Sequence, residues 1–148
     1  MFLIDVYKET DYQLVIASNY KNTEVITEVL KHRNITFNPL TDENDLNILF
    51  ENAHINALPT FQNTGIKLKL LNTLRQGKFI IANDYMVNET GLETLCEKAN
   101  TKTEFLSKTA KLFNKDFEVS FVEERKRLLE IFDSKSSAKK IIDLIFKK

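Results

Sequence analysis

The segment from residue 58 to residue 81 carries the residue types that could hold an anion. The end of a predicted strand leads to a polar loop with Gly65 and then to a predicted helix that has Lys67 and Lys69 within about its first turn. Glycine allows a close backbone approach, and the first N–H groups of a helix, which have no partner within it, attract phosphate groups. Two lysines there oppose the helix dipole unless an anion lies between them and the dipole. The spacing indicates a phosphate site, and the alternative is a pair of solvated lysines on an exposed helix face.

Several other catalytic motifs cannot be written in this sequence. Its three glycines, Gly65, Gly77 and Gly91, form neither a Walker A loop nor a dinucleotide-binding glycine turn. The short motifs of serine hydrolases, zinc peptidases and thioredoxin-like proteins are also missing. With one cysteine, Cys96, and two histidines far apart in the sequence, we expect no metal site and no cofactor. The motifs therefore argue against kinases, GTPases, NAD enzymes, hydrolases and redox enzymes.

The composition fits one compact domain. Of the 148 residues, 43% are hydrophobic and 28% are charged, and 21 basic residues balance 21 acidic ones. Balanced charge provides no positive field for nucleic acid, so we expect no nucleic-acid partner. The apolar runs are a few residues long, against the roughly 20 that a transmembrane helix needs, and a single cysteine fits a reducing compartment. We predict a cytoplasmic protein, with a location at the membrane surface as the second option.

Apolar runs and amphipathic segments alternate along the first half of the chain. Short runs rich in β-branched residues predict strands at residues 12–18, 35–37, 53–58 and 78–83. Apolar residues at helical spacing predict helices between these strands, around residues 25–30, 46–50 and 66–76. This alternation is typical of βαβ units and predicts an α/β fold, a Rossmann-like doubly wound and mostly parallel sheet between two helix layers, that is, a three-layer sandwich.

The last third of the chain is predicted to be helical. Apolar residues at helical spacing lie in residues 103–113, 119–132 and 137–146. No repeat and no linker divides the sequence. We therefore predict a single domain over residues 1–148, in which residues 115–148 form a C-terminal helical extension.

The sequence pattern does not decide the secondary structure of two segments. Residues 2–7 fit a helix face and a strand equally well. If they are helical, the doubly wound sheet begins with a helix, and a preceding strand lies outside this chain. Residues 84–91 are predicted as a loop with a turn at Gly91, and residues 92–99 as a short strand or a helical turn.

The position of a binding site follows from the predicted sheet. In doubly wound sheets, ligands bind at the carboxyl ends of the strands. These ends correspond to the loops at residues 18–23, 38–42, 59–65 and 83–91. We expect Phe37 to be a core residue, His54 to be a hydrogen-bonded structural histidine and Cys96 to be a packed thiol.

The elements around the lysine-bearing helix resemble a known donor site. In GT-B-type glycosyltransferases of the glycosyl transferases group 1 family, a strand leads to a loop with glycine, a helix of the form G-x-x-x-K-x-x-E-A-hydrophobic-A-x-G and a strand of the Pro-Val-Val type. The corresponding positions here hold Gly65, Lys69, Asn72, Leu74, Gly77 and residues 79–81. The resemblance covers nearly the whole chain. Further segments of the family's C-terminal half resemble residues 12–18, 35–39, 53–56, 90–93 and 100–105.

The resemblance implies a Rossmann-like donor-binding half of a glycosyltransferase. Such an enzyme transfers a hexose from a nucleotide-sugar to a glycan or lipid acceptor, as in bacterial cell-surface glycan synthesis. The resemblance also implies metal-independent transfer with the nucleotide-sugar as donor substrate and without a cofactor. The residues that it implies in nucleotide-sugar binding are Thr64, Gly65, Lys67, Lys69, Asn72, Asn38 and Pro39.

Three departures from the family pattern limit the likeness. Asn72 stands where the family has a ribose-binding glutamate, and its amide can form the hydrogen bond without the charge. The family's first strand, with its phosphate clamp, would precede Met1, and the acceptor-binding N-terminal half has no counterpart here. The catalytic residues are therefore unassigned, and an N-terminal half or a partner subunit is implied. The alternative from another class is a non-catalytic α/β module that binds a nucleotide or another protein.

Overall fold

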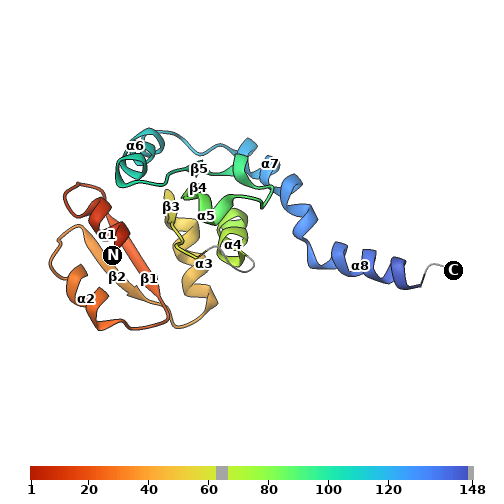
Figure 1. Ribbon diagram of the computed structural model, residues 1–148, viewed down its shortest axis with the longest axis horizontal. Coiled ribbons are helices and arrows are strands. Elements are labelled where there is room, and N and C mark those ends of the chain that lie inside the picture. The colour runs from red at the N-terminus through yellow and green to blue at the C-terminus, as the bar shows by residue number, and fades with distance from the viewer. Residues whose placement is uncertain (63–66, 147–148) are drawn as a thin grey trace.

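The computed structural model describes residues 1–62 and 67–146 and has an α/β architecture (Figure 1). The strands are β1 (Leu14–Ser18), β2 (Ile35–Pro39), β3 (Ile55–Leu58), β4 (Phe79–Ala82) and β5 (Glu97–Lys98). The α-helices are α1 (Phe2–Tyr7), α2 (Thr23–Val29), α3 (Glu43–Asn52), α4 (Leu68–Gln76), α5 (Asp84–Val87), α6 (Lys102–Phe113), α7 (Val119–Leu129) and α8 (Ser134–Ile145). Two short 3-10 helices are η1 (Glu93–Leu95) and η2 (Glu130–Phe132). The predicted strands, and the helices between them, are confirmed.

The strands form two small sheets. In the first, β1 pairs with β2, and Leu14 lies opposite Ile35. In the second, β4 lies between β3 and β5, and Ile55 lies opposite Phe79. Every pair is parallel, which confirms the predicted α/β class with parallel strands. The predicted single sheet is instead divided, because no backbone ladder joins β1 to β3 in the described part of the chain.

Helix α1 answers the open question about residues 2–7, which are helical and not a strand. Its side chains enter the cores of both sheets. Ile4 packs with Val29 of α2 and Ile35 of β2. Val6 packs with Ile81 of β4, on the other side of the helix. One helix therefore holds the two sheets together.

Strand β4 is buried on both of its faces. Ile80 and Ala82 pack against leucines of α4, and Phe79 and Ile81 pack against α1 and α6, where Phe105 is fully buried. The leucines of α4 are Leu70, Leu71 and Leu74. A parallel strand covered by helices on both sides explains the continuous apolar run that the sequence shows here.

The segment after β4 contains more regular structure than the sequence predicted. Residues 84–87 form a helical turn, so the prediction of a loop is wrong at these positions. The reason is local, since Asn83 precedes the turn in an extended conformation and Asp84 lies in its first turn. Residues 92–99 contain both alternatives, the 3-10 helix η1 and the two-residue strand β5. The predicted turn at Gly91 is confirmed by its φ of 74°.

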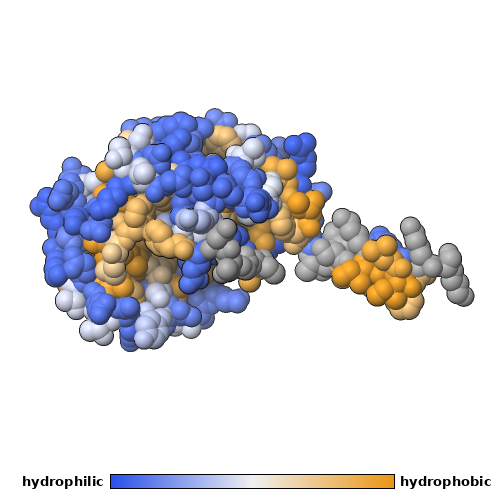
Figure 2. All heavy atoms as spheres, in the orientation of Figure 1, coloured by the Kyte–Doolittle hydropathy of each residue, from blue (hydrophilic) through white to orange (hydrophobic). Residues whose placement is uncertain are grey.

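The C-terminal helices differ in how they pack. Helix α7 is fastened to the end of α4 through Arg125, whereas α8 projects away from the other elements (Figure 1). Hydrophobic atoms lie along α8 in Figure 2. Its exposed apolar side chains, with Phe146 directly after it, are Ile141, Ile142, Leu144, Ile145 and Phe146. Among the described helices, none is long and apolar enough to cross a membrane.

Gly77 sets the closest approach between α4 and the neighbouring strand β3. A Cβ atom at this position would lie 2.6 Å from the Asn56 side-chain nitrogen and 2.9 Å from the Thr73 carbonyl oxygen. Both separations are shorter than a real Cβ contact, so a side chain larger than hydrogen would displace the Asn56 side chain of β3 and distort the last turn of α4, to which Thr73 belongs. The backbone conformation itself, with φ of −79°, suits any residue, so the constraint is purely steric.

We expect Gly77→Ala to lower the free energy of unfolding by about 1–3 kcal/mol, because overpacking a close contact costs about that much. Urea denaturation followed by circular dichroism measures the change. Adding Asn56→Ala should restore part of the loss, because it removes the nearer of the two clashing atoms. An unchanged urea midpoint in the single variant would contradict the steric role of Gly77.

Candidate functional site

The N-terminus of α4 lies at the carboxyl edge of the β3–β4 pair, after the loop that follows β3. Lys67 occupies the N-cap position, its side chain makes no capping hydrogen bond, and the first turn contains no acidic residue. The Lys67 ammonium donates instead to the carbonyl oxygen of Gln62 at 3.3 Å. In the described part of the chain, the first N–H groups of α4 therefore have no side-chain acceptor.

Three other helices begin differently, whereas α7 resembles α4 in having neither a side-chain cap nor an acidic residue in its first turn. The Asn22 side chain accepts hydrogen bonds at the start of α2, and the Asp42 side chain does so at the start of α3. Helix α6 has a capping box formed by Thr101 and Glu104. Each of these three helices also has an acidic residue in its first turn, which suits the positive end of the helix dipole. At α4, lysines stand where these helices have acidic groups.

Lys69 and Asn72 share one exposed face of α4, since residues three apart lie side by side on a helix. Lys67, Lys69 and Asn72 are thus brought to the same helix, with both lysines at its start. Thr64 and Gly65, which the resemblance also assigns to the site, lie outside the described residues. The described part of the predicted site is a cationic helix start with a neutral amide one turn further on.

Asn38 and Pro39 end β2 in the other sheet. The Leu40 N–H donates to the carbonyl oxygen of Ser18 at 2.9 Å, which joins the ends of β1 and β2. In the described residues, no hydrogen bond or ion pair connects Asn38 or Pro39 to α4. The structure therefore does not bring these two residues into contact with the lysine-bearing helix.

The loop after β3 is held in place by Asn83, which sequence reasoning did not single out. The Asn83 side-chain oxygen accepts from the Thr60 N–H at 3.0 Å, and its nitrogen donates to the Thr60 carbonyl oxygen at 2.6 Å. Asn83 is buried, at 6% exposed, and directly follows β4. This double hydrogen bond holds the chain at Thr60, directly after β3, against the end of β4.

The ends of β4 and β5 are joined by a second polar cluster. The Lys98 ammonium lies 2.6 Å from the Asp84 carboxylate, and the Asn100 side-chain nitrogen donates to the same carboxylate at 3.0 Å. The hydrogen bond from Lys98 lowers the pKa of Asp84, so this carboxylate stays charged at neutral pH. Lys98 is thereby paired within the protein, unlike Lys69, for which the described residues show no ion pair.

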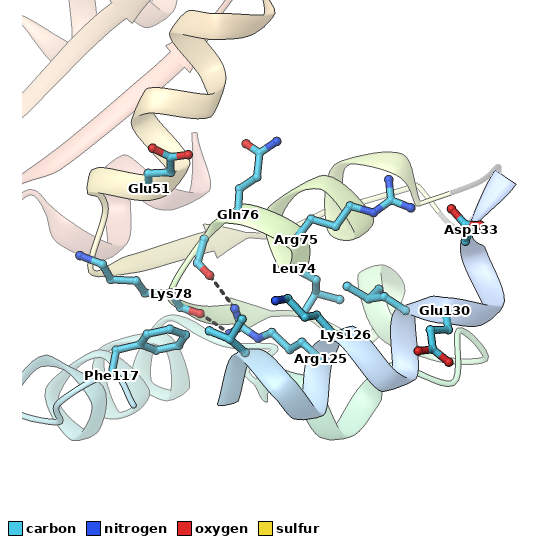
Figure 3. A pocket seen from close by; sticks show the side chains of 13 residues that line it. Glu51, Leu74, Arg75, Gln76, Lys78, Phe117, Arg125, Lys126, Glu130 and Asp133 are labelled. Carbon is cyan, nitrogen blue, oxygen red and sulfur yellow. Dashed lines mark hydrogen bonds between the residues drawn. The ribbon is translucent and has the colours of Figure 1, made fainter. Parts of the chain in front are cut away.

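A cavity of about 630 Å³ lies at the opposite end of α4 (Figure 3). Its wall contains Arg125, which is 7% exposed and donates to the carbonyl oxygens of Gly77, at 2.5 Å, and Lys78. The guanidinium also lies 5.2 Å from the centre of the Phe117 ring. Burial lowers the pKa of Arg125, and the carbonyl groups at the end of α4 partly balance its charge. These contacts make Arg125 a structural link between α7 and α4.

The remaining reactive side chains have structural surroundings. His54 lies 3.0 Å from the Leu112 carbonyl oxygen through its ring nitrogen and contacts the Phe79 and Phe113 rings, as expected for a structural histidine. Burial raises the pKa of the Cys96 thiol to about 12, so Cys96 is no nucleophile at neutral pH. In the described ranges, no three acidic, histidine or cysteine side chains gather as a metal site would require.

Comparison of the chain with family models, with curated proteins and with solved structures finds no match. The function must therefore be inferred from the residues and their geometry. Two features bear on it, the cationic start of α4 at the carboxyl edge and the cavity beside α7. The first has lysines for which the described residues show no acidic partner, whereas the buried Arg125 of the second is bonded to backbone carbonyls.

We expect Asn83→Ala to lower the free energy of unfolding by about 1–3 kcal/mol, because it leaves the Thr60 N–H and carbonyl groups without their partner. Chemical denaturation measures the change. Asn52→Ala, at an exposed position at the end of α3, is the matched control and should change stability by less than about 0.5 kcal/mol. Equal losses in the two variants would contradict the anchoring role of Asn83.

We expect the Cys96 thiol to resist labelling in the folded protein. A pKa near 12 leaves about one thiol in ten thousand ionised at pH 8, against a substantial fraction for an ordinary cysteine. Reaction with a thiol-specific chromogenic disulfide should therefore be at least about a hundredfold slower in buffer than in urea. Similar rates in the two solvents would show that Cys96 is accessible and ionised in the folded state.

Proposed function

We propose that the chain is the donor-binding half of a GT-B-type glycosyltransferase, a Rossmann-like domain that binds a nucleotide-sugar. The complete enzyme would transfer a hexose from this donor to a hydroxyl group of a glycan or lipid acceptor. An acceptor-binding half, in the same polypeptide or in a partner subunit, belongs to the proposal. The proposal also includes the three-layer arrangement of the domain and a cytoplasmic location, with the membrane surface as the second option.

The observation that carries the proposal is the start of α4. It combines Lys67 and Lys69 with N–H groups that have no side-chain acceptor among the described residues, and it lies at the carboxyl edge of two parallel strands. A doubly charged diphosphate suits this place, because it would accept hydrogen bonds from the N–H groups and would lie between the dipole and the lysines. The close contact at Gly77 supports the resemblance, since the family pattern has glycine at the same point of the helix.

The proposed chemistry requires stabilisation of a departing nucleoside diphosphate. The bond between the anomeric carbon and the phosphate oxygen breaks, and the acceptor oxygen bonds to that carbon after losing its proton. Charge develops on the diphosphate as it leaves, so a fixed dipole and the Lys69 ammonium would lower the barrier without a metal ion. Asn72, one turn along the helix, can exchange hydrogen bonds with a ribose hydroxyl. Asn38 and Pro39 would face the base.

A second candidate function is a non-catalytic α/β module that binds another protein. The observation that favours it is α8, whose apolar side chains are exposed over its last turns. The two functions differ in their ligand, because the module needs no nucleotide. A nucleotide titration therefore separates them.

The test is a calorimetric titration of the purified chain with UDP, GDP and ADP. We expect one of these nucleotides to bind with a dissociation constant between about 1 μM and a few millimolar. Lys69→Ala should weaken binding at least about fivefold, because it removes a cation beside the diphosphate. The matched control is Lys126→Ala, a lysine that lines the cavity beside α7, and it should leave the affinity unchanged.

The other outcomes of the titration would favour a different site or a different function. Weakening by Lys126→Ala alone would move the site to the cavity beside α7. Binding that neither variant changes would contradict the role of Lys69. No binding of any of the three nucleotides would favour the protein-binding module.

A further inference from the structure

β1 and β3 each have one strand edge that pairs with no other strand in the described part of the chain. Amide groups of a strand alternate in direction, and the Leu14 N–H points toward β2, where it donates to the Asn34 carbonyl oxygen at 2.9 Å. Val15 and Ala17, at odd positions of β1, therefore point their backbone groups away from β2. Described residues provide no backbone partner for them.

The same reasoning applies to β3. The His54 carbonyl oxygen accepts from the Phe79 N–H at 3.2 Å, so the even-numbered residues of this segment bond toward β4. Ile55 and Ala57 then point their backbone groups away from β4. Within the described chain these groups also have no backbone partner. Unpaired strand edges that face other protein are unusual, because a strand edge is a template for another strand.

The two open edges belong to strands of one βαβ series, and side chains of α1 reach the cores beside both. β2 leads through the crossover helix α3 into β3, and such a crossover makes the next strand parallel. Helix α1 contacts both cores, with Ile4 on the β1–β2 side and Val6 on the β3–β4 side. A helix is about 10 Å wide, and two strand spacings add up to about the same width. An added strand that pairs with both edges would need about this separation between β1 and β3.

The surroundings of this space are apolar. Figure 2 shows hydrophobic atoms in a hollow between the part that holds β1 and β2 and the part that holds α3 and β3, and Figure 1 shows no strand there. Val15 is 49% exposed, although it lies inside a strand of a parallel sheet. Leu14 of β1 packs against the cores on both sides of this space.

We infer that an extended polypeptide segment from outside residues 1–148 binds in this space as a parallel strand between β1 and β3. It would turn the two sheets into one continuous sheet in which β1 and β3 flank the added strand. A polypeptide is the required occupant, because only a backbone offers a row of N–H and carbonyl groups to both edges at once. Its side chains would be apolar and β-branched on alternate positions, as the hollow demands.

The test supplies such a strand within the same molecule. Residues 8–13 join α1 directly to β1, so α1 runs back against β1 and Met1 lies toward the carboxyl edge. An extension of about eight alternating valines and threonines, joined to Met1 by about four Gly and Ser residues, can then reach the space at a high effective concentration. The matched control carries prolines in place of the threonines, which removes N–H donors from the added strand.

Hydrogen exchange of single amides, followed by NMR, is the readout. In the extended protein, the amides of Val15, Ala17, Ile55 and Ala57 should exchange at least about tenfold more slowly than in the chain without the extension. The Leu14 amide already bonds to β2 and serves as the internal reference. The proline control should show no slowing. Ala17→Pro, which removes an N–H that points into the space, should reduce the protection of Ile55 and Ala57.

Two outcomes would overturn the inference. One is unchanged exchange at all four amides, which would mean that the open edges accept no strand. The other is protection at the outer edges of β2 or β5, or protection that appears only together with dimers in light scattering. Neither outcome depends on nucleotide binding, so the proposed function stands or falls separately.

Discussion

The close contact between α4 and β3 at Gly77 is the constraint on which the candidate site depends. Helix α4 buries Leu70, Thr73 and Leu74 almost completely, and the missing side chain at Gly77 lets this face lie against the sheet. The same packing determines where the other end of the helix points. A helix of nine residues is rigid over about 14 Å, so a displacement at Gly77 moves Lys67 and Lys69 as well. Packing at one end thus positions charge at the other.

The charged side chains at the two ends of α4 interact with the helix dipole in opposite ways. At its C-terminus, Arg125 bonds to the carbonyl oxygens of Gly77 and Lys78, and a cation is favourable there because the helix dipole is negative. At its N-terminus, Lys67 and Lys69 oppose the dipole. The favourable contact is buried and holds α7, whereas the unfavourable one is exposed to solvent, where an anion can reach it. The contact that stabilises the fold and the candidate site therefore lie at opposite ends of the same helix.

Local sequence patterns predicted the strands and crossover helices well, because each is set by apolar periodicity and a helix start or stop signal. Contacts between distant residues were beyond this information. Residues 2–7 fit a helix and a strand alike, and only packing of Ile4 and Val6 against two sheets decides between them. The hydrogen bonds between Asn83 and Thr60 join loops 23 residues apart, which no periodicity reveals. The division into two sheets depends on backbone pairing, which the pattern of side chains does not determine.

Each lysine at a helix start lowers the stability of a solvated helix by a few tenths of a kcal/mol. This cost is small enough for such lysines to occur without a functional reason. The contrast within this chain makes the cost informative. Helices α2, α3 and α6 combine a side-chain cap with an acidic first turn, so the sequence uses the stabilising solution at three other helices of the same domain. Helix α7 also begins without a side-chain cap and without an acidic residue in its first turn, so what distinguishes α4 is the position of its two lysines at the carboxyl edge of two parallel strands. A diphosphate would convert the unfavourable term into a favourable one, since the lysines and the dipole would then attract the same anion.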